Sequence, residues 1–251
     1  MRAMRSARIA GIEFQGWPAD HHGDWYTLDA EGIKSFWGGV EVRREEVSRP
    51  SAHGSFDREG FLSARVIPVS GHMSSRTPQG LEHLQARLSG LLADGSSARL
   101  TLDGPLGSRW CDVRLASATQ ITQMDATTAR FLVTFWSADP RTYGEARTFP
   151  AGSPAVNFGN FPATPRLLIG AGTGGYTVTG PSGRVVVVGT APTAAHYIDF
   201  ASGGLFNEAG VRQIGAITTY QPWRIPPGLP GVTATITGTR TLSQSMTNTF
   251  L

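Results

Sequence analysis

The sequence predicts a nearly all-β protein with one helix, built as two β-sandwich domains. Three observations lead to this fold class: one clear helical period, several stretches of alternating apolar and polar residues, and a change of composition past the middle of the chain. The chain has 251 residues, which suits one large domain or two small ones. Its single cysteine, Cys111, excludes a disulfide within the chain, and a core of this size needs none.

The helix is expected at about 77–93. Thr77 can cap its N-terminus with Pro78 at the first helical position, and Asp94-Gly95 is typical of a stop. The apolar stripe comes from leucines three or four residues apart, namely Leu81, Leu84, Leu88, Leu91 and Leu92.

Alternating residues predict strands over most of the remaining chain. Cys111, Val113 and Leu115 would share one face of a strand. A second strand would place Val232, Ala234 and Ile236 on one face. Segments 131–136 and 185–188 are apolar at every position or nearly so, and we expect them to be covered on both sides.

A composition break near Asp139-Pro140 separates two parts of the chain. Most charges, five of the six tryptophans and the helix precede it, whereas threonine, glycine and short hairpin-like runs follow it. We therefore expect a boundary between about 143 and 154, giving an N-terminal domain at 1–147 and a C-terminal domain at 148–251.

Charge and hydropathy exclude several classes of protein. The formal net charge of +3 is too small and too scattered to indicate nucleic-acid binding by itself. Lys34 is the sole lysine, so arginines supply nearly all cations, as a GC-rich genome or buried subunit contacts would favour. No apolar run approaches the roughly 20 residues of a membrane span, and the N-terminus has no apolar signal-peptide core. We expect a soluble intracellular product without membrane insertion.

Motifs for metals, cofactors and catalysis are weak. The run Asp20-His21-His22-Gly23-Asp24 has metal-capable side chains but lacks a partner pair at metal-site spacing, so no metal is expected. The glycines at 170–175 match GxGxxG, but the strand-like residues that follow exclude a dinucleotide site, and no cofactor is expected. A β-turn is the better interpretation of these glycines.

An enzyme is the least favoured class, and we expect no catalytic residues. His53 beside Gly54 could serve as a base, and a glycosidase pair could come only from carboxylates held across a cleft, such as Glu45, Glu46, Asp57 and Glu59. These carboxylates are better explained as partners of nearby arginines. Cys111 is expected to be a small core residue.

Aromatic residues in the second half leave a carbohydrate-binding module or host receptor-binding module as the alternative function. Trp223 stands beside a Pro-Pro-Gly turn, which could hold it outside the core, and Tyr176 is a second candidate. The competing interpretation places both rings in the core of a sandwich, together with Tyr197, Phe206 and Tyr220.

The order of these features resembles the siphophage distal tail proteins over nearly the whole chain. The likeness begins with Phe36-Trp37-Gly38-Gly39, Glu41, Val42 and Arg43, and continues with RPSAHGSFD at 49–57. It then includes a strand at 64–69 ending in Gly71, the helix from Thr77, the residues DPRTY at 139–143, and NFGNFPATPRLLIGAG at 157–172.

The resemblance implies a structural protein of the tail tip in the virion, assembled in the host cytoplasm. Its N-terminal domain would form a hexameric ring and its C-terminal domain would be galectin-like, without catalysis. The expected partners are copies of the chain, the tail tube protein, the tape-measure protein and a tail-associated tip or fibre protein, with DNA only as passing cargo in the lumen. A closed ring needs two complementary patches on each subunit; we expect one of them at the mixed-charge residues Glu41, Arg43, Arg44, Glu45, Glu46 and Arg49.

Overall fold

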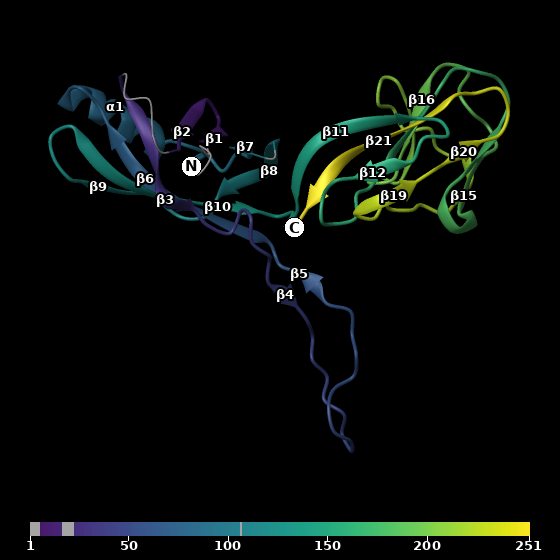
Figure 1. Cartoon of the computed structure of the whole chain (residues 1–251), viewed down its shortest axis with the longest axis horizontal. Coiled ribbons are helices and arrows are strands. Elements are labelled where there is room, and N and C mark those ends of the chain that lie inside the picture. The colour runs from purple at the N-terminus through teal and green to yellow at the C-terminus, as the bar shows by residue number, and fades with distance from the viewer. Residues whose placement is uncertain (1–5, 17–22, 106) are drawn as a thin grey trace. The chain divides into compact units, whose positions relative to one another are not determined.

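Strands make up nearly all of the regular structure in the computed structural model, which describes residues 6–16, 23–105 and 107–251. Within this part of the chain there is one α-helix and one short 3-10 turn, Pro181–Gly183 (Figure 1). The chain divides into two compact units, Met1–Thr142 with Leu251 and Tyr143–Phe250. The all-β class with one helix is confirmed.

Unit 1 is built around a sheet that closes on itself. Its strands follow the order β9-β10-β6-β3-β2-β1-β7-β8, and β8 pairs back with β10 through Phe135–Leu115 and Trp136–Arg114. The first domain is therefore a barrel-like closed sheet instead of two separate layers. The strands are β1 Ser6–Ile9, β2 Ile12–Gln15, β3 Trp25–Ile33, β6 Arg65–Ser74, β7 Ala98–Gly104, β8 Gly107–Leu115, β9 Gln120–Gln123 and β10 Thr128–Ser137.

The core of unit 1 follows the alternation of its strands. In β10, Phe131, Val133 and Phe135 are buried, and in β8 Cys111 and Val113 are buried with them. The expectation that 131–136 is covered on both sides is wrong for this chain by itself, because Trp136 remains 38% exposed. Apolar residues on the outer face of β10 thus belong to an open surface.

Gly71 lies within β6 instead of ending it, as the sequence had indicated. Its position faces β3, where any Cβ would collide with the carbonyl oxygen of Thr27. A glycine here lets the two strands approach closely, which is one reason for glycine inside a strand.

The helix α1 spans Pro78–Ser89, and Thr77 caps it as predicted, since its Oγ1 accepts a hydrogen bond from the Gly80 N–H at 3.1 Å. The helix ends four residues before the predicted limit of Ala93. Leu92 has φ of 55°, a left-handed conformation that cannot continue the helix. Leu91 and Leu92 are nevertheless buried, so the apolar stripe predicted the contact but not the helical end.

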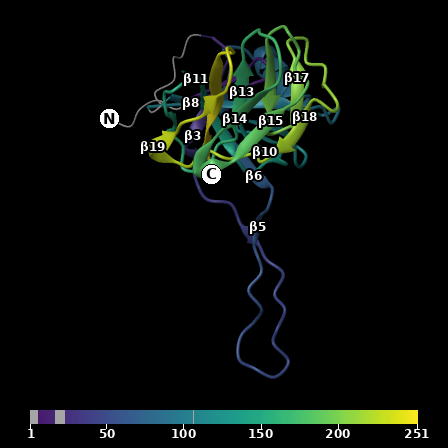
Figure 2. The same ribbon diagram turned by 90° about the vertical axis from the view of Figure 1, so that its right-hand side faces the viewer.

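A long arm leaves unit 1 between β3 and β6. Its two short strands, β4 Val42–Arg43 and β5 Phe61–Leu62, pair with each other in a two-stranded sheet of their own. Figures 1 and 2 show this segment running away from the closed sheet to a hairpin-like tip.

Unit 2 is a sandwich of two antiparallel layers. One layer has the order β17-β16-β13-β21-β11 and the other β18-β15-β14-β20, with β12 paired to β19 beside them. The strands are β11 Thr142–Pro150, β12 Ala155–Asn157, β13 Arg166–Ile169, β14 Tyr176–Thr179, β15 Val185–Val188, β16 His196–Asp199, β17 Gly204–Asn207, β18 Ile217–Tyr220, β19 Gly228–Val232, β20 Thr235–Ile236 and β21 Leu242–Phe250.

Residues from both layers meet in one core. Val186 and Val188 of β15 are buried in it, whereas Val185 and Val187 are half-buried on the opposite face. Coverage on both sides is thus only partial at 185–188. The predicted strand through Val232 is interrupted between β19 and β20, although Val232 itself is buried as expected.

Candidate assembly surfaces

The arm carries all of the mixed-charge residues predicted as a subunit contact. Glu41, Arg43, Arg44, Glu45, Glu46 and Arg49 are all exposed on it. Within this set, Glu45 forms an ion pair with Arg58 at 3.5 Å, and the Glu46 carboxylate accepts a hydrogen bond from the Ser55 hydroxyl. Such exposed pairs contribute little to stability. The structure therefore brings these residues together on one projecting element but does not bury any of them.

Large apolar side chains also lie exposed along the arm. Phe61 is 62% exposed and Phe56 is 52% exposed, and Val42 and Val47 are exposed as well. Arg49 covers the ring of Phe56 only partly, with its guanidinium 5.7 Å from the ring centre. Apolar groups gathered on one thin element are unfavourable in water, so the arm has the composition of a surface that is covered by a partner.

Few backbone hydrogen bonds hold the two sides of the arm together. Arg49 N–H donates to the Gly54 carbonyl at 3.1 Å, and Phe56 N–H donates to the Val47 carbonyl at 2.9 Å. Gly54 has φ of 84°, which favours glycine at the turn of the tip. An element with so few internal contacts needs support at its base.

Arg65, at the start of β6, supplies that support. It is 1% exposed, and its guanidinium donates to the carbonyls of Ser35, of Phe36 at 3.3 Å and of Gly38 at 3.0 Å. Its Nε donates to the Pro140 carbonyl at 2.8 Å. One arginine thus fixes the backbone at the base of the arm to the segment after β10.

Burial lowers the pKa of Arg65, because the charged guanidinium loses water that the protein only partly replaces. Its Nη2 has no hydrogen-bond partner in the described part of the chain. Arginine suits this place because its planar fork can reach several carbonyls at once and is weakly hydrated.

A second apolar surface lies on the outer face of the closed sheet. Trp136 of β10 stands opposite Val66 of β6 and opposite Arg114 of β8 in the strand registers. Trp136 is 38% exposed and Val66 is 46% exposed. These three residues, which we call the Trp136 row, give unit 1 an apolar patch with a cation at its end.

The two residues predicted to bind carbohydrate lie inside unit 2. Trp223 is 3% exposed, and its ring packs edge-on against Phe200 with centroids 4.8 Å apart. The interpretation that Trp223 stands outside the core is wrong, and the competing interpretation that places it in the core is confirmed; Gly180 leaves the room that its ring fills. Tyr176 is buried as well. Neither ring presents a face on which a sugar could stack.

Tyr176 instead belongs to a buried polar network. Its hydroxyl lies 2.7 Å from Nε2 of His196, and Nδ1 of His196 lies 2.9 Å from the Ala194 carbonyl. The carbonyl fixes the proton on Nδ1, so Nε2 accepts from the tyrosine. Burial raises the pKa of Tyr176 and lowers the pKa of His196, which keeps both groups neutral.

The GxGxxG segment is a loop between β13 and β14, and a strand follows it as predicted. Arg240 is buried beneath this loop and donates to the carbonyls of Gly170 at 3.2 Å and of Gly172 at 2.6 Å. The loop therefore turns carbonyl oxygens toward a cation, the opposite of what a pyrophosphate requires.

Asn157, the last residue of β12, holds the turn that follows this strand. It is buried, its amide donates to the Phe161 carbonyl at 2.7 Å, and its oxygen accepts from the Gly159 N–H at 2.9 Å. A Cβ at Gly159 would collide with the Thr249 carbonyl oxygen. The NFGNF residues thus form a tight turn against the end of β21.

The residues considered for catalysis or metal binding do not converge. His53, Asp57 and Glu59 are exposed on the arm, and burial raises the pKa of the Cys111 thiol to about 12, as expected for a core cysteine. Asp20, His21 and His22 lie outside the described residues. Among residues 6–16, 23–105 and 107–251, no cluster of three metal-capable side chains occurs. The α-helix of these residues, at 12 residues, is too short to span a membrane.

No family model and no curated protein sequence matches the chain. Among solved structures, it is similar to SPP1 Dit (gp 19.1), described as a paradigm of the hub adsorption apparatus in phages that infect Gram-positive bacteria. The TM-score is 0.76 at 16% identity, covering 98% of this chain and 99% of that one. The chain has the fold of a phage Dit protein. The phage P2 baseplate is also similar, with a TM-score of 0.48 at 9% identity over 96% of this chain and 97% of that one.

The resemblance to distal tail proteins is thus confirmed at the level of the fold. Several segments that carry this resemblance have structural roles. The loop at 36–39 and Asp139-Pro140 both contact Arg65, and the segment that begins at Asn157 forms the turn against β21. Arg65 was missed as a site residue. Its signal was present, because alternation along β6 places it on the same face as Ile67 and Val69.

Proposed function

We propose that this protein is a structural distal tail protein of a siphophage, located at the tail tip of the virion and assembled in the host cytoplasm. Six copies form a ring through unit 1. The ring joins the tail tube protein to a tail-associated tip or fibre protein, surrounds the end of the tape-measure protein and leaves a lumen for DNA, and unit 2 is a galectin-like sandwich. The protein acts by assembly and performs no catalysis. The observation that carries the proposal is the exposed apolar arm on a Dit fold.

In the proposed ring, the arm of one copy covers the Trp136 row of the next. A cyclic ring uses head-to-tail contacts, so each subunit must offer two different patches that fit each other. Phe56 and Phe61 supply apolar area on the arm, and Trp136 with Val66 supplies it on the closed sheet. Arg114 at the end of the row suits the glutamates of the arm.

The proposal is tested by the mass of the full chain in solution at high protein concentration, measured by light scattering after gel filtration. We expect six times the chain mass of 26.8 kDa. Replacing Phe56 and Phe61 together with serine should reduce the mass to that of one chain, and Trp136→Ala should do the same from the other side of the contact.

Phe158→Ser is the matched control, because Phe158 is equally exposed but lies in unit 2. It should leave the mass of the assembly unchanged. A native chain that stays monomeric at high concentration would count against the ring. An assembly that survives both the arm variant and Trp136→Ala would show that other surfaces build it.

The carbohydrate-binding alternative loses its two predicted residues, since Trp223 and Tyr176 are core residues. A role in host recognition would therefore have to use another surface of unit 2.

A further inference from the structure

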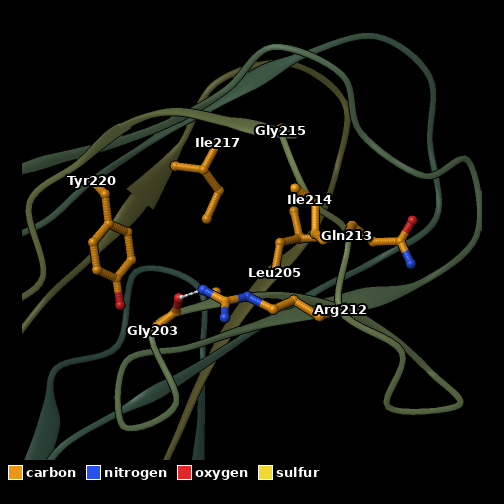
Figure 3. Close-up of a pocket in the computed structure, with 9 residues that line it drawn as sticks. Gly203, Leu205, Arg212, Gln213, Ile214, Gly215, Ile217 and Tyr220 are labelled. Carbon is orange, nitrogen blue, oxygen red and sulfur yellow. Dashed lines mark hydrogen bonds between the residues drawn. The ribbon is translucent and has the colours of Figure 1, made fainter.

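Unit 2 contains a hollow between β17, β18 and the loop that joins them (Figure 3). Its volume is about 470 Å³, within the range of roughly 300–1,000 Å³ of small-molecule pockets. The hollow is open to solvent and belongs to unit 2 alone, so the ring contact proposed above does not require it.

Apolar and polar groups line different sides of the hollow. Leu205 and Ile217 form its apolar wall, and Ile214 at the rim is 93% exposed. Tyr220 and Arg212 lie on opposite sides of this space, and the Arg212 guanidinium extends across its floor to the Gly203 carbonyl (Figure 3). Such a division suits a ligand that has one apolar face and several polar groups.

The charge of the hollow is positive. None of its lining residues is acidic. Arg212 donates one hydrogen bond to the Gly203 carbonyl at 2.6 Å and forms no ion pair with any carboxylate of the described chain. Asp199 lies near Tyr220, but its carboxylate accepts from Arg166 at 2.7 Å and from the Ala201 N–H at 2.9 Å. The remaining N–H groups of Arg212 are thus available to an anion.

We propose that this hollow binds a saccharide unit that carries a negative charge. The C–H face of a sugar ring packs against the Tyr220 ring and the aliphatic wall, as aromatic and apolar groups pack on each other. The Tyr220 hydroxyl meets a hydroxyl of the sugar. Arg212 pairs with the carboxylate or phosphate group, for which the guanidinium fork is well suited.

The test is calorimetric titration of the full chain with glucuronic acid, with glucose 1-phosphate and with neutral glucose. The two acids separate a carboxylate ligand from a phosphate ligand, and we expect at least one of them to bind about tenfold or more tightly than glucose. Arg212→Gln should abolish this preference, and Tyr220→Phe should weaken binding of the charged sugar about tenfold.

Ile214→Asp provides a second variant that removes no internal contact, because Ile214 is almost fully exposed. Its added negative charge should weaken binding of the charged sugar while leaving glucose unaffected. Arg184→Gln is the matched control, since Arg184 is an exposed arginine of the same unit that likewise donates to a backbone carbonyl, that of Pro222 at 2.6 Å. It should bind like the native chain.

Equal binding of glucose and both acids, or an unchanged preference in both Arg212→Gln and Ile214→Asp, would overturn the proposal. Absence of binding by all three sugars at millimolar concentration would overturn it as well. Neither result bears on the mass of the ring, so failure here is distinguishable from failure of the assembly proposal.

Discussion

Two buried arginines hold loop backbone in place in the two units. Arg65 gathers carbonyls at the base of the arm, and Arg240 gathers carbonyls of the glycine loop between β13 and β14. In both places a delocalised, weakly hydrated cation faces several carbonyl oxygens that β-strands cannot satisfy. The arginine-rich composition is therefore in part a means of holding irregular backbone, in addition to the subunit contacts considered from the sequence.

His196 should make the stability of unit 2 depend on pH. Burial lowers the pKa of His196 below its ordinary value of 6.5. Below pH 6.5, His196 of the unfolded chain therefore becomes protonated while His196 of the folded chain stays neutral. The free energy of unfolding should fall as pH drops through this range, by up to about 1.4 kcal/mol per pH unit, and should be insensitive to His196 above it. Urea unfolding at pH 7.5 and pH 5, followed by the NMR amide signals of β14 and β16 in unit 2, measures this.

His196→Gln should flatten the pH dependence, whereas the control His83→Gln, at an exposed helical position, should keep it. An identical slope in the native chain and in His196→Gln would show that other groups cause it.

The burial of a side chain could be predicted where it follows the alternation of apolar and polar residues along a strand. It could not be predicted where a glycine far away in the sequence leaves room for the side chain. Cys111 and Val113 are buried as their spacing indicated. For Trp223 the proline and glycine neighbours in sequence left both a surface position and a core position open. Its burial depends on Gly180, where any Cβ would lie 2.7 Å from the indole ring, and such a contact has no signal in a single sequence.

At the scale of elements, starts were easier to predict than ends, and projecting elements were hardest. The cap at Thr77 has local chemistry that sequence reveals, but the end of α1 follows from the backbone at Leu92. The arm has little alternation of apolar and polar residues and few backbone hydrogen bonds between its two sides. The sequence therefore indicates its charged residues as a candidate subunit contact but does not indicate that the segment projects from the sheet. Its anchor at Arg65 depends on two segments far apart in the chain.

Arg65→Met should free the base of the arm and destabilise unit 1. The buried Phe36 carbonyl and three partly buried carbonyls would lose their donor. An unsatisfied buried group costs about 1–3 kcal/mol, so we expect a loss of at least about 2 kcal/mol in urea unfolding. Amide exchange at 35–38 should quicken beyond the change elsewhere in the unit. Arg65→Lys should recover only part of the loss, because one ammonium cannot reach all the carbonyls.

Arg99→Met is the comparison for this variant. Arg99 is an exposed arginine of β7 that pairs with Asp112 at 3.5 Å and stacks on the Trp110 ring, with its guanidinium carbon 3.6 Å from the ring centre. The loss of these two exposed contacts should cost about 1 kcal/mol. Equal effects of the two changes would mean that Arg65 is not an anchor.

For the molecule as a whole, two separate cores predict two separate unfolding events. The buried clusters of the units share no residue. Each unit also has a glycine at which a Cβ would collide with a backbone carbonyl oxygen: Gly71 against Thr27 in unit 1 and Gly159 against Thr249 in unit 2. Scanning calorimetry should therefore resolve two thermal unfolding transitions. The variant with Phe56 and Phe61 replaced by serine is used, because in a monomer the unfolding of one copy is not coupled to that of its neighbours. Gly71→Ala should lower one transition and Gly159→Ala the other, each by roughly 4–16 °C for a loss of about 2 kcal/mol or more. A single transition that both variants shift alike would show that the units fold as one body, and the ring would then have to be built from the whole chain instead of from unit 1.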